Sequence, residues 1–464
     1  MTPPLVVVDV VGLTSAQVGS DTPALAALAR EGFMTPLSAV FPAVTCSAQA
    51  SMLTGALPRQ HGIVGNGWYF RDLAEIWLWR QSNRLVAGEK VWEAARRQVP
   101  GFTCAKLFWW YNMYSSADWS VTPRPAYPAD GRKVPGIYCQ PHDLRDELER
   151  ELGPFPLFHF WGPSADITSS RWIADCARLV IERKRPSLTL VYLPHLDYDH
   201  QRYGPDDPRS RVALRSVDNL VAALVGHARR SGAEVLIVSE YGIRQVRRPV
   251  DINRALRRAG LLAVQETLGW ELLDAGASRA FAVADHQVAH VYVRDPADQA
   301  HVRALLEGLG GVAEVLDESG KKTVGLDHPR AGELVAVAAP DAWFTYYYWL
   351  DDSRAPDFAP TVDIHRKPGY DPAELFLRRD HLGTKLRIGW RLLQKSLGFR
   401  YLMDVIPLHG AWVSGSHGRL PDDPAHGPVL IGSARTLAPT GTPGTTDVFQ
   451  LILHHVAPRS DTLR

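Results

Sequence analysis

The sequence contains little cysteine, and its few cysteines lie far apart. Cys46, Cys104, Cys139 and Cys176 show no C-x-x-C spacing. This pattern argues against a disulfide framework and against a zinc knuckle. We therefore expect reduced thiols, as in a cytoplasmic protein.

Long apolar runs are also missing. No stretch approaches the roughly 20 apolar residues that a membrane-spanning helix requires. The first residues, MTPPLVVVDVVGL, enter an apolar run without a positive leader or a small-residue cleavage site. We expect no membrane span and a cytoplasmic location.

The chain has no excess of charge of either sign. Lys and Arg number 51 against 50 Asp and Glu, a net charge of +1. This balance argues against a nucleic acid polymer or an anionic membrane as a bulk electrostatic partner. A local basic pocket remains possible, and the composition sets no oligomeric state.

The pattern that is present is typical of an α/β protein. Short apolar runs bounded by turn residues alternate with amphipathic segments, which predicts a mostly parallel sheet flanked by helices. The predicted strands are residues 5–11, 189–194, 234–240, 334–340 and 428–433, and the predicted helices are residues 22–32, 164–184, 210–230 and 446–456. Ligands of such sheets bind at the carboxyl ends of the strands.

At 464 residues the chain is longer than one core usually supports. Between 265 and 330 a compact strand, helix and strand unit reads as an insertion that could cap the site. We therefore predict an α/β core formed by residues 1–264 and 331–464, with a small α/β cap at 265–330. A further segment, 385–402, is apolar on one helical face and basic on the other. It suits a membrane surface, but a surface helix packed on the core is the commoner meaning.

The stretch FPAVTCSAQASMLTG, residues 41–55, places Thr45 at the start of a predicted helix. A threonine there can cap the helix. The same helix end, with its free N–H groups and positive dipole, can instead hold a phosphate while Thr45 attacks it. Both interpretations are open on this stretch alone.

The residues that follow resemble the type I phosphodiesterase and nucleotide pyrophosphatase family of the alkaline phosphatase superfamily. That family has a pattern similar to P-x-x-T, then T-G-x-x-P-x-x-H-G-I-x-x-N. The matching residues here are Thr45, Thr54, Gly55, Pro58, His61, Gly62, Ile63 and Asn66. The resemblance implies an alkaline-phosphatase-like fold, Thr45 as nucleophile and Asn66 as a donor to the phosphoryl oxygen.

The resemblance also implies two divalent ions, zinc or manganese, but the ligand positions match only in part. Asp197 begins the family's D-x-x-x-H motif and His417 lies in its final S-H-G motif. Gln201 stands at the histidine position, with His200 one residue early. We therefore expect Asp197 and His417 to bind metal, helped by His200 or Gln201, and leave one or two ions open.

The other ion's ligands depart further. Val11 replaces the aspartate of the first strand, with Asp9 two residues back on the same strand face. Glu240 and Tyr241 replace the Asp-His pair of the family's S-D-H-G motif. Glu240 and Asp9 remain candidate ligands, and Tyr241 could hydrogen-bond where a metal once lay.

Further polar residues could contact a substrate. ADHQVAH places Asp285, His286 and His290 at the edge of the inserted unit, and TVDIHRK contributes His365 and Lys367. Arg124 follows an aromatic stretch. We list Tyr241, His286, His365, Lys367 and Arg124 as candidate substrate-binding residues, although a lone histidine is more often structural.

Together these residues predict a metal-dependent hydrolase of phosphodiester, pyrophosphate or related phosphate ester bonds, acting on a small molecule through Thr45. Two alternatives stay open. One is a binding or scaffold protein that keeps the fold and has lost turnover. The other is a phosphoryl transferase, which shares the first half-reaction with a hydrolase.

Overall fold

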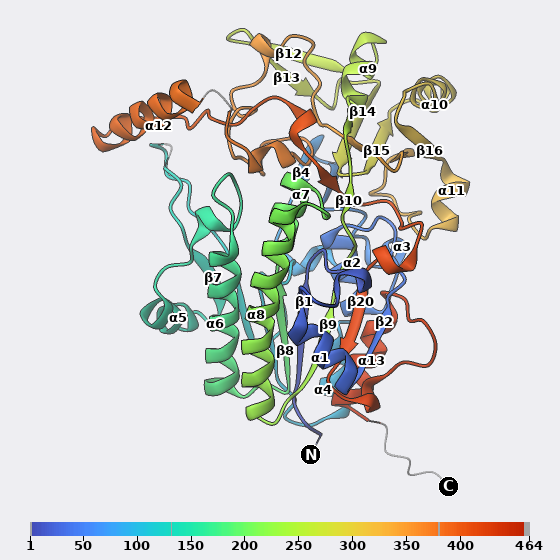
Figure 1. Ribbon diagram of the computed structural model, residues 1–464. Helices are drawn as coiled ribbons and strands as arrows, with labels where there is room; N and C mark the ends of the chain where they lie inside the picture. The colour runs from blue at the N-terminus through green and yellow to red at the C-terminus, as the bar shows by residue number, and fades with distance from the viewer. Residues whose placement is uncertain (1, 131, 379–380, 459–464) are drawn as a thin grey trace.

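The computed structural model describes residues 2–130, 132–378 and 381–458 (Figure 1). An eight-stranded sheet forms its centre, in the order β2-β20-β9-β1-β8-β5-β6-β7. The strands are β1 (Leu5–Val10), β2 (Phe33–Pro36), β5 (Cys104–Leu107), β6 (Trp119–Pro123), β7 (Ile137–Gln140), β8 (Leu188–Leu193), β9 (Glu234–Val238) and β20 (Val429–Gly432). Strands β9, β1, β8, β5 and β6 are parallel, whereas β20 and β7 run antiparallel to their neighbours.

Helices cover both faces of this sheet. One layer contains α1 (Pro23–Glu31), α6 (Ile167–Lys184) and α8 (Pro208–Arg230), and the other contains α2 (Thr45–Thr54), α4 (Val91–Gln98) and α13 (Asp447–Val456). Every residue of β1 is buried, as expected for a central parallel strand covered on both sides. The predicted fold class is confirmed in its architecture: this is an α/β structure with a mostly parallel sheet flanked by helices.

A second sheet lies beyond the carboxyl ends of the central strands (Figure 1). It is antiparallel, in the order β14-β15-β17-β16, formed by β14 (Ala280–Asp285), β15 (Val288–Val293), β16 (Val312–Leu316) and β17 (Leu334–Ala338). It has its own hydrophobic cluster, with α10 (Gln299–Glu307) and α9 (Ile252–Arg258) packed on it.

One predicted strand belongs to a different sheet from the one expected. Residues 334–340 were assigned to the parallel core sheet, but β17 pairs with β15 and β16 of the second sheet. Its apolar composition suits a buried position in either sheet, so only long-range pairing decides between them. The predicted domain boundaries at 264 and 330 stay a prediction.

Shorter elements surround the junction of the two sheets. They are α3 (Pro58–His61), β3 (Gly67–Phe70), β4 (Glu75–Leu78), α5 (Leu144–Leu152), α7 (His195–Tyr203), β10 (Arg244–Gln245), β11 (Arg248–Val250), β12 (Ala263–Thr267), β13 (Trp270–Asp274), α11 (Glu318–Thr323), β18 (Ala342–Phe344) and β19 (Gly415–Ser416). Among the helices of the described ranges, none combines the length and apolar character needed to cross a bilayer.

Helix α12 (His381–Ser396) extends away from both sheets (Figure 1). The sequence favoured a helix packed on the core through its apolar face. That expectation was wrong, because Leu386 is 67% exposed and Trp390 57%. Only Ile388, on another side of the helix, packs against a small buried cluster at Val405 and Ile406.

Close backbone packing fixes β19 against α7. A Cβ added at Gly415 would lie 2.0 Å from the carbonyl oxygen of His200. We predict that Gly415→Ala lowers the free energy of unfolding by about 3 kcal/mol, because backbone must move to admit the methyl group. Urea denaturation measures this loss. In Gly389→Ala, where the added Cβ meets nothing within 4 Å, stability should be unchanged or up to about 1 kcal/mol higher. Equal stabilities for the two variants would contradict the prediction.

Candidate active site

The candidate site forms where β1, β8 and β9 end. Asp9 lies on β1, paired in register with Tyr192 of β8 and Val238 of β9. Glu240 and Tyr241 follow β9 directly, and Asp197 lies in the first turn of α7, just after β8. Parallel strands thus bring together residues more than 200 positions apart, at the sheet edge where ligands of such folds bind.

Thr45 is the first residue of α2 and is not its N-cap. The cap residue is Val44, which makes no side-chain capping bond. The helix end is capped from outside, because the Cys46 backbone N–H donates to Asn66 Oδ1 at 3.0 Å. The Thr45 hydroxyl instead lies 3.0 Å from the Tyr241 hydroxyl. It is therefore free of a capping role and lies within the buried site.

Two buried carboxyl groups lie beside Thr45. Gln49 Nε2 donates to Asp9 Oδ2 at 3.1 Å and to Glu240 Oε1 at 2.7 Å. The Trp110 backbone N–H donates to Gln49 Oε1 at 2.7 Å, which fixes the orientation of the amide. Gln49 thus holds both carboxyl groups in place with its two N–H donors.

Burial decides the protonation of this pair. It raises the pKa of Asp9 to about 7, against the stabilising hydrogen bonds of Glu240 and Gln49. Burial, and next the charge of Asp9, raise the pKa of Glu240 well above its usual range, while Thr45 and Gln49 act in the opposite direction. The two carboxyl groups both accept from Gln49 Nε2, and the charge of one disfavours ionisation of the other. The raised pKa of Glu240 favours its protonated form at neutral pH.

Four stacked rings form a column beside the carboxyl pair. The Tyr241 ring stacks on His417 at 3.5 Å between centroids, His417 lies 3.7 Å from His286, and His286 stacks on Tyr370 at 3.7 Å. His417 and Tyr241 belong to the main body, whereas His286 lies in the turn between β14 and β15. The column thus joins the second sheet to the site.

The two histidines in the middle of this column are neutral. Burial lowers the pKa of His286 well below its ordinary value, and burial with the neighbouring His286 does the same for the pKa of His417. His417 Nδ1 lies 2.9 Å from the Ala43 carbonyl oxygen, which can only accept, so Nδ1 carries the proton. His417 Nε2 is left as an acceptor without a partner among the described residues.

Asp197 completes the group. Its Oδ1 accepts from the Tyr241 hydroxyl at 3.4 Å and lies 3.9 Å from His417 Nε2. Burial raises the pKa of Asp197 to about 7, opposed by a hydrogen bond from Gln201. The structure therefore brings the predicted residues Thr45, Asp9, Glu240, Tyr241, Asp197 and His417 together.

Comparison with known proteins identifies the family of this chain. The model of the family described as type I phosphodiesterase / nucleotide pyrophosphatase matches residues 5–371. The chain belongs to this family. It is also 23% identical over 265 residues to an uncharacterized pyrophosphatase/phosphodiesterase of Schizosaccharomyces pombe. That match covers 54% of this chain and 46% of the relative, so the chain spans about half the length of the curated relative it matches.

Solved structures agree on the fold. Phosphonoacetate hydrolase from Sinorhizobium meliloti, in complex with phosphonoformate, superposes with a TM-score of 0.62 at 15% identity, covering 98% of this chain and 96% of the other. An inactive form of murine ectonucleotide pyrophosphatase / phosphodiesterase 5, in complex with AMP, gives 0.57 at 14%, covering 98% and 95%. At these identities the likeness shows the fold alone.

The residues present do not fit the family's two ions. Within the described ranges, no group of three or more His, Cys, Asp or Glu side chains is arranged to hold a metal. Asp197 and His417 form only a pair, and the Tyr241 ring is stacked against His417 beside them. One oxygen each of Asp9 and Glu240 accepts from Gln49 Nε2, so the amide stands between the two carboxyl groups.

His200 and Gln201 do not complete the pair. His200 is turned toward Gly12, whose added Cβ would lie 3.8 Å from its Nδ1. Both of its ring nitrogens lack a partner among the described residues. Gln201 Oε1 accepts from the Tyr370 hydroxyl at 2.9 Å, which commits its oxygen elsewhere. The motif spacing predicted His200 or Gln201 as a metal ligand, but it gave no sign that Tyr370 would donate a hydrogen bond to Gln201.

Asn66 is held by the second sheet. Its backbone N–H donates to Asp285 Oδ2 at 2.8 Å and its Nδ2 donates to Asp285 Oδ1 at 2.9 Å. Asp285 Oδ1 also lies 2.8 Å from His286 Nδ1. One Nδ2 hydrogen of Asn66 remains for another acceptor. Asn66 is thus positioned at the end of α2, as the family motif implies.

Three candidate substrate residues lie apart from Thr45. Lys367 Nζ is buried between Asp371 Oδ2 at 2.7 Å and Glu374 Oε1 at 2.8 Å, so its charge is already neutralised. His365 packs edge-on against Tyr127, and Arg124 is exposed. Within the described ranges, no hydrogen bond or ion pair joins these three side chains to Thr45.

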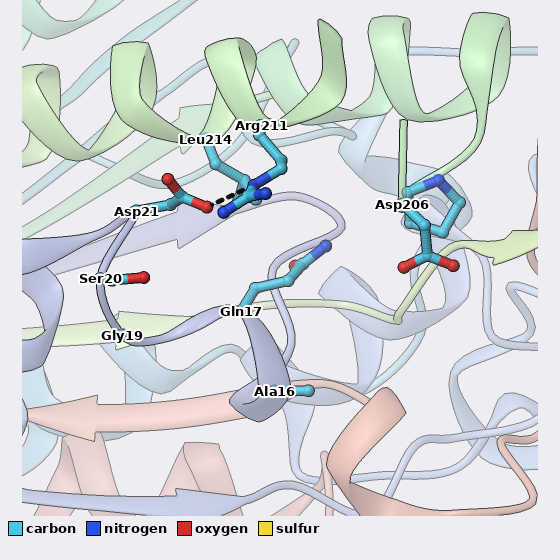
Figure 2. A pocket seen from close by; sticks show the side chains of 9 residues that line it. Ala16, Gln17, Gly19, Ser20, Asp21, Asp206, Arg211 and Leu214 are labelled. Carbon is cyan, nitrogen blue, oxygen red and sulfur yellow. Dashed lines mark hydrogen bonds and ion pairs between the residues drawn. The ribbon is translucent and has the colours of Figure 1, made fainter. Parts of the chain in front are cut away.

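Two hollows lie near this end of the molecule. One, of about 380 Å³, is lined by Tyr241, Gln287 and Arg419 among others and so reaches the site. The other, of about 430 Å³, lies against α8 (Figure 2). There Arg211 Nε pairs with Asp21 Oδ2 at 2.7 Å, and the described lining contains none of the predicted site residues. The first hollow is therefore the candidate entrance.

Sequence reasoning missed Gln49 and Tyr370. The sequence did hold a signal for Gln49. It is a large polar residue one turn after Thr45, in a helix whose other residues are small or apolar and whose residues 45–53 are all buried. Tyr370 carried no such signal, because it lies in an irregular loop whose position depends on the second sheet. Its backbone N–H donates to the Ala284 carbonyl oxygen at 2.9 Å.

The buried carboxyl pair predicts a specific pH dependence of stability. The pKa of Asp9 is raised from 3.8 to about 7, so the folded state holds a proton that the unfolded state releases. Stability from this group is complete below about pH 4 and is lost as the pH rises toward 7. In the wild type, we predict that the free energy of unfolding falls by roughly 2–4 kcal/mol between pH 4 and 8 because of this group. In Asp9→Asn this fall should be absent. Chemical denaturation of both proteins across this range measures the difference.

Asp21 supplies a control of opposite sign. Its exposed carboxylate is stabilised by Arg211 and Arg215, which lower its pKa. Its contribution is present at neutral pH and lost on acidification, so Asp21→Asn should reduce stability slightly at pH 7 and not at low pH. A wild-type curve whose difference from Asp9→Asn does not change with pH would contradict the assignment.

Proposed function

We propose that this chain is a hydrolase of small phosphate or phosphonate esters, in which Thr45 accepts the phosphoryl group. The observation that carries the proposal is the placement of the Thr45 hydroxyl at the N-terminus of α2, against Tyr241 and beside the Asp9–Glu240 pair. Family membership supports the reaction class. The two ligands named for the similar solved structures, AMP and phosphonoformate, guide the choice of substrate class.

In the first half-reaction, the Thr45 oxygen forms a bond to phosphorus and the bond to the leaving oxygen breaks. The Thr45 proton passes to the carboxyl pair. Glu240, next to Thr45, acts as the general base in its ionised form, which its raised pKa places at alkaline pH. In the second half-reaction, water attacks phosphorus and gives its proton to the departing Thr45 oxygen, and the proton held by Glu240 passes to the released leaving-group oxygen.

The end of α2 stabilises the transferring group. The first turn of a helix has N–H groups without intrahelical partners and a positive dipole end. The remaining Nδ2 hydrogen of Asn66 points to the same region, since its Oδ1 caps Cys46. Donors fixed before the reaction lower the cost of the negative charge that develops on the phosphoryl oxygens. Tyr241 orients the Thr45 hydroxyl.

We expect Thr45→Ala to lower kcat/KM by at least about 10³-fold, because it removes the nucleophile. Glu240→Gln should cost about 10²–10⁴-fold by removing the base. The assay is hydrolysis of aryl phosphodiesters, AMP esters and phosphonoacetate, with mass spectrometry of acid-quenched protein to detect a phosphoryl group on the Thr45 peptide. Thr54→Ala, at the other end of α2, is the matched control, since its hydroxyl only donates to Ala50. Activity that persists in Thr45→Ala contradicts the nucleophile.

The metal expectation gives a separate prediction. Because Asp197 and His417 lack a third ligand among the described residues, we expect less than one zinc or manganese ion per chain after dialysis against either metal. Elemental analysis of wild type and of His417→Ala measures this content. About one or two ions per chain, lost in His417→Ala, would restore the metal-dependent hydrolase that the sequence predicts.

A second candidate function is binding without turnover. The observation that favours it is the closed state of the site, in which Thr45 is 3% exposed and Tyr241 packs over it. Isothermal titration of AMP and phosphonoacetate into wild type separates the two. Binding with no product after prolonged incubation, and no phosphoryl group on Thr45, would favour the binding protein.

A further inference from the structure

Helix α12 presents an apolar face that the protein itself leaves uncovered. Its exposed apolar side chains recur at the spacing i, i+4, i+8, i+11 and i+15, which places them on one side of a helix. We call this set the apolar stripe; it consists of Leu382, Leu386, Trp390, Leu393 and Leu397. Exposed fractions of 73% for Leu382 and 63% for Leu397 show that both ends are open. A continuous exposed apolar surface of this kind marks an interaction site.

The opposite side of the helix attaches it to the body. Ile388 packs against the cluster of Val405 and Ile406, and Thr384 is buried. Arg391 Nε pairs with Asp404 Oδ1 at 3.1 Å, and Arg387 pairs with Asp404 Oδ2 at 2.8 Å. These contacts fix the orientation of α12. Because they lie on the side opposite the apolar stripe, the stripe faces solvent.

The charge of the segment indicates the kind of partner that the apolar stripe can bind. Residues 381–402 contain cations without any Asp or Glu: Lys385, Arg387, Arg391, Lys395 and Arg400. Lys385, Lys395 and Arg400 form no ion pair within the described ranges. The rest of the chain is nearly balanced, with a total net charge of +1, so this positive charge is local.

We propose that α12 docks on an anionic lipid surface, lying parallel to it with the apolar stripe inserted among the acyl chains. Basic amphipathic helices with Leu and Trp on the apolar face bind membranes in this way. Lys385 flanks the stripe on one side and meets lipid phosphates, and Trp390, at the other edge of the stripe, lies at the level of the headgroups. No span is needed, and the sheets remain outside the bilayer.

A second copy of the chain fits less well. Two α12 helices packed stripe to stripe would place Lys385 of each at the edge of the shared interface, beside the other cationic segment, and the like charges would repel. The helix offers no carboxylate to offset this repulsion. Anionic headgroups provide the opposite charge along the whole segment.

The test is co-sedimentation of the full chain with phosphatidylcholine vesicles, with and without phosphatidylglycerol. Wild type should bind the anionic vesicles at least about tenfold more tightly than the neutral ones. Leu386→Glu combined with Trp390→Glu should abolish binding, and Lys385→Glu should reduce it toward the neutral level. Val212→Glu changes another exposed apolar helix position, on α8, and should bind as wild type.

Thermal unfolding of each variant should match wild type, because the substituted side chains are exposed. Failure of wild type to bind anionic vesicles, or equal binding to neutral ones, overturns the proposal. A dimer in light scattering that Leu386→Glu dissociates, with no vesicle binding, overturns it in favour of a second copy.

Discussion

The burial of Asp9 constrains the whole site. The residue lies on the central strand of the sheet, where both neighbouring strands and both helix layers exclude water. A carboxylate there needs donors or a proton, since an isolated buried charge is very costly. Gln49 supplies donors from α2 to Asp9 and to Glu240 beside it, and burial raises the pKa of both carboxyl groups. The start of α2, and with it Thr45, is thereby fixed against the ends of β1 and β9.

The substitutions that distinguish this chain from its family pattern form one physical unit. Val11 removes a ligand from the first strand, Tyr241 fills space with a ring stacked on His417, and Glu240 pairs with Asp9. An amide and a ring stack thus lie where the family pattern has metal ligands. Among the described residues, His417 Nε2, both ring nitrogens of His200 and one oxygen each of Asp9 and Glu240 have no hydrogen-bond partner.

The second sheet contributes to the site as well as covering it. Its β14–β15 turn places Asp285 on Asn66 and His286 on His417. His286 has a φ of 62°, a left-handed conformation that non-glycine residues seldom adopt. The stacking on both of its faces and the contact with Asp285 hold it there. The turn is thus shaped by the site, and α12 lies outside this arrangement, with charges and an apolar stripe that serve another contact.

The sequence by itself determined the fold class, four strands of the central sheet (β1, β8, β9 and β20), the helices α1, α6, α8 and α13, and the family motif from Thr45 to Asn66. Periodicity and turn residues are local, and they suffice for these features. The sequence also located the departures at Val11, Gln201, Glu240 and Tyr241. Tertiary structure alone decided that Gln49 bridges Asp9 and Glu240, that Tyr370 engages Gln201, and that β17 joins the second sheet. It also decided that α12 leaves its apolar stripe uncovered. The sequence pattern identifies which face of a helix is apolar, whereas its contacts depend on tertiary packing.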